Sequence, residues 1–206
     1  MKKIIASVVC AVAIIGAALP ARAEFRYGPT ASVDVTTLNF KQDLFTVDKS
    51  VGYSAGVAAE MMFPGIGFGL DLGLRYQQRG ATLHLGERKM WEAEGYGINR
   101  CYLHQIDVPF HLKFKYTRLG GFETTLAPFV YAGPTFSFTV AHNKIDALQY
   151  AGGEVGIEFG VGAEIKQHWQ VSFAYDWGVT YALKTRQLAN MSAKQSTFDL
   201  RLTYLF

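Results

Sequence analysis

The chain has 206 residues, and half of them are hydrophobic. Its formal net charge is +3, from 20 basic and 17 acidic residues, but three of the basic residues lie within the first 23 positions. The other 183 residues carry 17 charges of each sign. This balance excludes the strong positive field by which nucleic-acid-binding proteins attract their ligand, so we expect no nucleic-acid partner.

The first 23 residues have the features of a secretory signal peptide. Met1–Lys3 is basic, residues 4–19 are uncharged and apolar, and Ala21-Arg22-Ala23 fits the small-x-small cleavage pattern. An uncleaved membrane anchor is the alternative, but the apolar run is shorter than the ~20 residues that a spanning helix needs. We therefore predict a cleaved signal peptide over residues 1–23 and one domain over residues 24–206.

After this segment, apolar residues recur at every second position in eight stretches, which is the period of a β-strand. The apolar positions in them carry no charge, whereas the positions between hold acidic and basic side chains. With 11 residues or more, each stretch could cross a bilayer as a tilted strand. The stretches are 26–36, 51–62, 67–78, 104–116, 126–140, 151–166, 169–180 and 195–206.

The alternation predicts a sheet with one apolar and one ionic face. A soluble β-sandwich would alternate in the same way, with its apolar face turned inward. Two features favour a membrane barrel instead. Many glycines lie on the ionic face, where they suit a narrow lumen. The connections also alternate between long and short, at about 14, 4, 25, 9, 10, 2 and 14 residues, as expected when both termini lie in the periplasm. We predict an all-β, eight-stranded antiparallel up-and-down transmembrane β-barrel whose apolar face meets lipid.

Two local features qualify this prediction. Pro128 and Pro134 each remove a backbone donor, so we expect a bulge or local distortion in the fifth stretch. Cys101 is the one cysteine after the signal segment, and an unpaired thiol in an oxidising compartment is more often structural than catalytic.

Several segments resemble the PorT-like family of outer-membrane β-barrel proteins. Residues 104–113 (HQIDVPFHLK) are similar to a family strand with the pattern acidic, apolar, Pro, three apolar and Lys, although His111 replaces an apolar residue here. Residues 128–134 (PFVYAGP) and 73–80 (GLRYQQRG) resemble two further strands of that family. The resemblance implies a small porin-like barrel in the outer membrane of a Gram-negative bacterium.

The charged residues on the ionic face are the first candidate site. Side chains can fill an eight-stranded barrel, so an open channel is not expected and ionic residues inside should pair with one another. A proton or ion pathway, or a narrow pore for small solutes, is the alternative interpretation. The candidate network consists of Arg26, Asp34, Glu60, Asp71, Arg75, Asp107, Lys113, Glu158, Asp176, Asp199 and Arg201.

A lipid-modifying or proteolytic enzyme at the barrel rim is the rival class of function. Such an enzyme needs a nucleophile, a base and an orienting group near the rim. His84, His104 and His142 lie in or beside the expected outer loops, but no close Asp–His or His–Ser pair stands out. No metal-ligand spacing is present either, so we expect neither catalysis nor a cofactor.

The remaining candidates concern partners. Trp91 stands among charged residues in the 25-residue connection and could contact an extracellular ligand, since loops on a rigid scaffold often carry recognition. Tyr204 and Phe206 end the chain with aromatic residues, which resembles the signal that outer-membrane insertion machinery recognises. Outer-membrane lipid is the expected partner of the apolar face. The most defensible role is that of a non-enzymatic membrane protein with structural or surface-interaction duties.

Overall fold

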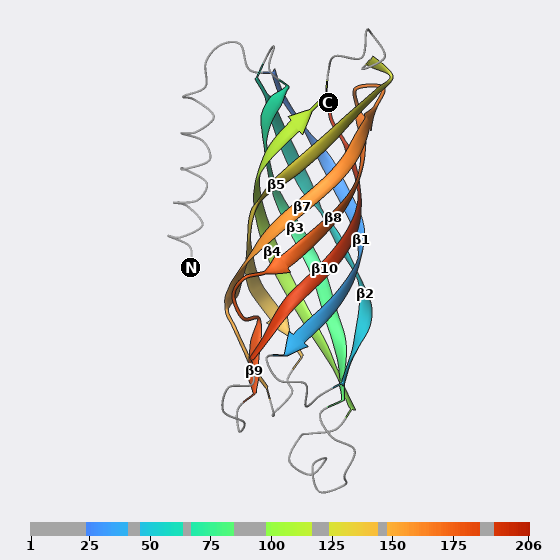
Figure 1. Cartoon of the computed structure of the whole chain (residues 1–206). Coiled ribbons are helices and arrows are strands. Elements are labelled where there is room, and N and C mark those ends of the chain that lie inside the picture. The colour runs from blue at the N-terminus through green and yellow to red at the C-terminus, as the bar shows by residue number, and fades with distance from the viewer. Residues whose placement is uncertain are drawn as a thin grey trace, which may run out of the picture.

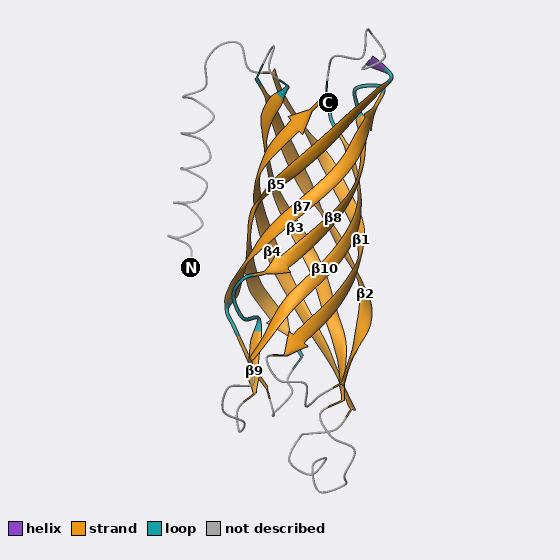
Figure 2. Cartoon of the chain, viewed as in Figure 1, coloured by secondary structure: helices purple, strands orange, loops and turns teal. Residues whose placement is uncertain are grey.

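A computed structural model describes residues 24–40, 46–63, 67–84, 98–116, 124–143, 148–185 and 192–206. They form a single antiparallel sheet that closes on itself as a barrel, and strands make up nearly all of the part drawn in colour (Figures 1 and 2). The eight long strands are β1 (Glu24–Phe40), β2 (Thr46–Met62), β3 (Phe68–His84), β4 (Ile98–Lys115), β5 (Leu126–His142), β7 (Gly153–Ile165), β8 (Trp169–Gly178) and β10 (Ser192–Tyr204).

The described residues contain no helix that is long and apolar enough to cross a membrane.

Pairing between the first and last strands closes the barrel. β1 runs antiparallel to β10 from Thr30↔Thr203 to Phe40↔Ala193, and every other long strand pairs with its neighbours in the chain. An even number of long strands places Glu24 and the C-terminus at the same end, which we call the terminal end; the opposite end is the loop end (Figure 1). The predicted eight-stranded up-and-down barrel is confirmed.

The apolar face points outward and the ionic face points into the lumen, as the alternation predicts. Val33, Phe110 and Leu200 are between 42% and 58% exposed, although they are large and hydrophobic. Asp107 and Lys113, which have the opposite parity on β4, are no more than 1% exposed. In water this arrangement would expose a large apolar surface and bury charge, both of which are unfavourable. Hydrocarbon around the wall removes the first cost.

Two connections at the loop end are shorter than the sequence indicates. The expected 14-residue connection shrinks to residues 41–45, and the expected 25-residue connection shrinks to residues 85–97. β1 to β5 have 17 or 18 residues each, well beyond the ~11 that cross a bilayer, so their ends extend past the apolar band. Apolar alternation cannot reveal these extensions, because water on the outside of the wall no longer requires apolar side chains there.

Two short strands at the loop end continue the wall. β6 (Leu148–Tyr150) precedes β7, and β9 (Leu183–Thr185) follows β8. β6 and β9 pair with each other, and β9 also pairs with β10. After a short break, β6 and β9 thus extend the lines of β7 and β8 toward the loop end. Figure 1 shows β9 at the end of the barrel opposite the C-terminus.

The prolines of β5 leave the register intact. β5 pairs with β7 without a shift from Leu126↔Ile165 to Phe138↔Gly153. On the β4 side the ladder skips the positions opposite Pro134, and the only register shift lies near the loop end, between His104 and Gln105 of β4. The local distortion expected in the fifth stretch is therefore confirmed. It consists of the skipped pairs opposite Pro134 and of one extra residue of β5, Val140, at the register shift. An antiparallel residue bonds to one neighbour only, so a proline weakens one side of its strand.

Aromatic rings inside the lumen cover two glycines of β7. Tyr131 of β5 faces Gly160 across the pair, and Phe129 faces Gly162. A Cβ atom at Gly160 would collide with the Tyr131 ring, and one at Gly162 would lie 2.5 Å from Phe129 Cζ. The absence of these two side chains lets the rings lie flat against the wall, which fills the lumen and shields the glycine backbone.

The outward facing predicts the cost of a charge in the apolar band. Phe110→Arg, Val130→Arg or Phe159→Arg should each destabilise the folded barrel by about 2–4 kcal/mol, as for arginine at a bilayer midplane. Denaturant titration in lipid vesicles measures this cost. Asn39→Arg, at an exposed position near the loop end of β1, is the control and should cost far less. Equal costs at the two kinds of position would contradict the assigned facing.

Candidate functional site

The lumen holds its charged side chains in three groups stacked along the barrel axis. The strand β3 contributes one residue to each, at intervals of four: Asp71, Arg75 and Arg79. We call the groups the terminal tier, the middle tier and the loop-end tier, in order from the terminal end. A fourth group, made of apolar side chains, lies beyond the loop-end tier.

The terminal tier has equal numbers of positive and negative charges. Lys113 Nζ lies 2.8 Å from Glu60 and 3.0 Å from Asp71, and Lys115 Nζ lies 2.8 Å from Glu60 and 2.7 Å from Glu164. Arg26 pairs with both Glu60 and Glu164. Each buried carboxylate therefore has at least one cation in contact, which buried charge requires if it is to remain ionised.

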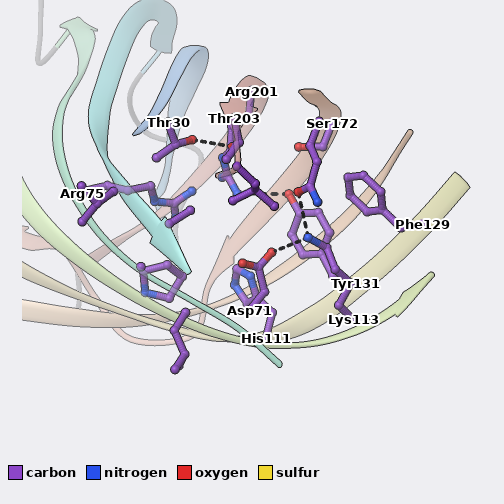
Figure 3. A pocket seen from close by; sticks show the side chains of 17 residues that line it. Thr30, Asp71, Arg75, His111, Lys113, Phe129, Tyr131, Ser172, Arg201 and Thr203 are labelled. Atoms are coloured by element: carbon purple, nitrogen blue, oxygen red, sulfur yellow. Dashed lines mark hydrogen bonds and ion pairs between the residues drawn. The ribbon is translucent and has the colours of Figure 1, made fainter. Parts of the chain in front are cut away.

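The middle tier is also balanced. Arg75 Nη2 donates to Glu158 Oε2 at 2.8 Å, and Arg201 Nη2 forms an ion pair with Glu158 Oε1 at 2.8 Å. Arg201 also lies 3.2 Å from Asp199. Arg201 also donates to the Tyr131 hydroxyl at 3.1 Å. Figure 3 shows Arg75, Arg201 and Lys113 around a small enclosed space, a cavity of about 20 Å³ between the terminal and middle tiers. That volume has room for about one water molecule, far less than a channel needs.

The loop-end tier is not balanced. Its charged residues are Asp34, Arg79, Asp107, Glu154 and Asp176, so one cation faces four carboxyls. Arg79 lies 3.1 Å from Asp176 and 3.6 Å from Asp107. Asp34 and Glu154 instead accept hydrogen bonds from the neutral amides of Gln77 and Gln105, each at 3.2 Å. All five charged residues are at least nine-tenths buried.

An apolar cluster closes the lumen beyond this tier. We call it the loop-end plug, and Val47 and Tyr150 pack against it. Leu83 and Cys101 are fully buried, and the Cys101 thiol lies 3.7 Å from the Tyr150 hydroxyl. The lone cysteine is thus part of the packing. The plug consists of Leu38, Ala81, Leu83, Cys101, Leu103, Leu148, Ala182, Leu183 and Ala193.

A family comparison agrees with this architecture. The family model for the outer membrane protein beta-barrel domain matches residues 18–183. The chain belongs to this family. No curated protein matches the chain.

Solved barrels share the fold at low sequence identity. The outer membrane protein OprG from Pseudomonas aeruginosa is 12% identical, with a TM-score of 0.52 over 90% of this chain and 96% of that one. Neisserial surface protein A is 11% identical, with a TM-score of 0.46 over 87% of this chain and 97% of that one. The attachment invasion locus protein Ail of Yersinia pestis is 12% identical, with a TM-score of 0.45 over 89% and 99%. At such identities the likeness concerns the fold alone.

Membership of this family locates the barrel in the bacterial outer membrane. Barrels of that membrane keep both termini and the short turns in the periplasm, so the loop end of this chain faces outward. The loop-end plug then lies at the outer mouth of the lumen, and the terminal tier lies at the periplasmic mouth.

The structure brings together all eleven residues that the sequence suggests for the lumen network, because each has the inward parity on its strand. The candidate network lacks Arg79, because the third stretch ends at residue 78, and it also lacks Lys115, Glu154 and Glu164, which are buried in the lumen. The plug residues are absent from the candidates too. Ala81 and Leu83 of β3 and Cys101 and Leu103 of β4 fell in the expected second loop, although they alternate in phase with the inward face and could have been recognised by that.

The rim histidines have partners that the sequence did not indicate. Strand pairing places His84 opposite Thr46, which lets its Nε2 lie 2.9 Å from Asp48 Oδ2. The Nδ1 atom of His104 lies 2.7 Å from the Tyr76 hydroxyl. A close Asp–His pair therefore exists, contrary to the expectation. It could not be found from the sequence, because 36 residues separate its members.

The structure describes two of the three aromatic residues that the sequence suggests as partner contacts. Trp91 lies outside the described residues. Tyr204 and Phe206 lie at the terminal end with ring centroids 5.1 Å apart, and Phe206 is 66% exposed on the outward face.

The contacts of the terminal tier predict that the stability of the barrel depends strongly on Glu60. Glu60→Gln removes the carboxylate that Arg26, Lys113 and Lys115 share, which leaves buried cations without enough negative charge. We expect a loss of about 3–5 kcal/mol in unfolding free energy, as when one partner of a buried pair is removed. Denaturant titration of the refolded protein in vesicles measures it. The matched control is Glu24→Gln, an exposed carboxylate 3.8 Å from Arg26, which should leave the unfolding midpoint unchanged. Similar losses in both variants would contradict the tier.

Proposed function

We propose that this chain is a non-enzymatic outer-membrane protein whose closed barrel serves as a rigid support for surface loops, with a structural or surface-interaction role. One observation carries the proposal: ionic tiers and an apolar plug fill the lumen along its length. A barrel filled in this way can hold the loop-end connections at fixed positions, and its outward face offers only apolar side chains to lipid. The ligand of those loops would be extracellular.

A narrow pore is the first alternative. The space between the terminal and middle tiers amounts to about 20 Å³, and Leu83, Cys101 and Leu103 lie fully or almost fully buried in the plug at the outer mouth. A permeating ion would have to displace the apolar side chains of the plug. It would also have to break ion pairs whose nitrogen and oxygen atoms lie only 2.7–3.2 Å apart. These contacts favour a closed lumen.

A rim enzyme is the second alternative. Hydrolysis by a histidine-dependent mechanism needs a nucleophile within hydrogen-bond reach of the histidine. The partners of His84, His104 and His142 are the Asp48 carboxylate, the Tyr76 hydroxyl and the backbone carbonyl of Asn143. None of these three partners is a serine, threonine or cysteine, which favours a non-catalytic rim.

We also propose that the chain is a PorT-like member of its family, made as a precursor with a cleaved signal peptide over residues 1–23. The three segments that resemble PorT-like proteins, residues 73–80, 104–113 and 128–134, lie in the consecutive strands β3, β4 and β5. A shared block of three neighbouring strands supports a relationship more strongly than scattered matches.

The proposal predicts an inert protein in reconstituted vesicles. Vesicles that contain the folded chain, a trapped small solute and fluorescent phospholipid should release neither the solute nor free acyl chains above the level of protein-free vesicles. A porin of established conductance is the positive control for release. Steady solute release would support a pore, and acyl release that is lost in His84→Ala would support an enzyme. Either outcome would overturn the proposal.

The exposed terminal aromatic predicts a role in assembly. We propose that the insertion machinery recognises Phe206, since its ring lies exposed on the outward face beside Tyr204. Phe206→Ser should reduce the amount of heat-modifiable, folded barrel in outer-membrane fractions several-fold. It should leave spontaneous folding into pure lipid vesicles nearly unchanged. Equal defects with and without the machinery would point to a packing role instead.

A further inference from the structure

The loop-end tier carries an excess of negative charge that the other tiers do not have. The terminal tier pairs Arg26, Lys113 and Lys115 with three carboxylates, and the middle tier pairs two arginines with two carboxylates. Among the described residues, the loop-end tier sets one cation, Arg79, against Asp34, Asp107, Glu154 and Asp176, which gives the tier a formal charge of −3 when all four are ionised. Arg75 of the middle tier also attracts Asp107 and Asp176, but its charge is matched by the carboxylates of its own tier. Like charges in a poorly solvated space repel strongly, so this state is unfavourable.

The same tier also lacks hydrogen-bond donors. Among the described residues, no donor reaches Oδ1 of Asp107, Oε2 of Glu154, Oδ1 of Asp176 or the side-chain oxygens of Gln77 and Gln105. Gln77 and Gln105 are neutral and 1% exposed, so their unsatisfied oxygens are an observation independent of the acidic cluster. The unsatisfied buried atoms of this tier are all acceptors. In the middle tier, by contrast, unsatisfied donors on Arg75 and Arg201 accompany the unsatisfied acceptors.

Excess negative charge and missing donors have one common remedy, which is a proton on a carboxyl group. Protonation removes a negative charge and converts an acceptor oxygen into a donor. We propose that the loop-end tier is a proton-binding site, in which the folded barrel at neutral pH holds at least two protons among Asp34, Asp107, Glu154 and Asp176.

The geometry points to Glu154 and Asp34 as the main carriers. Asp107 and Asp176 have the Arg79 guanidinium within 3.6 Å and 3.1 Å, which favours their ionised forms. Glu154 accepts hydrogen bonds from amides: Gln105 at 3.2 Å and, with its amide in the orientation that satisfies both ends, Gln195 at 3.0 Å. Asp34 likewise accepts from Gln77 and from the Thr36 hydroxyl, each at 3.2 Å.

Charged neighbours on the surrounding strands favour the same assignment. Glu154 of β7 faces Arg79 of β3, Asp107 of β4 and Asp176 of β8. A proton on Glu154 Oε2 would therefore have carboxylate acceptors nearby. Asp34 of β1 faces Arg79 of β3 and Asp199 of β10. Glu154 thus faces two negative groups and one positive group, and Asp34 faces one group of each sign. Among the described residues, no cation lies within 4 Å of either carboxyl group.

The surroundings of the tier explain why protons rather than metal ions are the expected ligand. The described residues hold no group of three or more His, Cys, Asp or Glu side chains that could coordinate a metal ion. Leu83 and Leu103 of the plug separate the tier from the outer surface, and a hydrated cation would have to displace them. A proton needs no coordination shell and can be shared between adjacent oxygens.

Proton binding sets the sign of a pH effect on stability. A carboxyl that keeps its proton in the folded barrel but loses it on unfolding stabilises the barrel at low pH, and this stability is lost as the pH rises. Each proton held in this way changes the unfolding equilibrium constant by about tenfold per pH unit. Acidic conditions at the cell surface would therefore strengthen the outer part of the barrel.

Infrared spectroscopy of the folded protein in vesicles tests the proposal directly. At pH 7.5 the wild-type barrel should show the carbonyl stretch of protonated carboxylic acids, which shifts on exchange into D₂O. Glu154→Gln should remove part of this band, and Asp34→Asn with Glu154→Gln should remove most of it. Absence of the band from the folded wild-type protein at pH 7.5 would overturn the proposal, and this measurement needs no variant to fold.

Denaturant titration at several pH values is the second test. The unfolding midpoint of the wild type should fall as the pH rises from about 5 through neutrality, and Glu154→Gln should flatten this slope. Glu60→Gln is the matched control, because its carboxylate is paired with cations; it should lower the midpoint at every pH and retain the slope. A slope that is unchanged by Glu154→Gln, or a high-pH stability that depends on added calcium and is lost with a chelator, would contradict proton binding.

Discussion

Every backbone N–H and C=O group that lies in hydrocarbon must find its partner within the protein, and this constraint determines the rest of the structure. An open sheet would leave two unpaired edges, each group costing several kcal/mol. The pairing of β1 with β10 removes both edges. Once the sheet closes, every strand must present alternate residues to lipid and to a narrow lumen. The charged side chains of the membrane-spanning residues must therefore point into the lumen.

Enclosure makes charge balance a local requirement. A carboxylate in the lumen cannot rely on bulk water, so its nearest cation decides whether it stays ionised. Glu60, with three cations in contact, and Glu154, with two amides, represent the two extremes in one lumen. The balance changes along the axis because β3 supplies the one cation that the described residues give the loop-end tier, whereas β1 and β4 together supply three cations at the other end.

The low identity to barrels of the same fold has a related cause. Alternation of apolar and polar residues is enough to specify a membrane barrel, and it leaves the choice of residue at each position largely free. Chains that are 12% identical, such as OprG, can therefore share the architecture. Function depends on particular residues of the lumen and the loops, which the shared strand pattern does not specify, so the fold does not carry a function with it.

The sequence by itself determined which face of each strand meets lipid, how many strands cross and that Asp107, Lys113 and Glu158 point inward, because the two-residue period of a strand is visible in one dimension. The tertiary structure decided the rest. The stagger between neighbouring strands sets which residues lie at the same height along the barrel axis. The alternation within each strand looks the same whatever this stagger is, so the sequence does not reveal it. Only the folded barrel therefore shows that Lys113 meets Glu60, that Arg79 stands alone among four carboxyls and that Leu83 and Leu103 close the mouth.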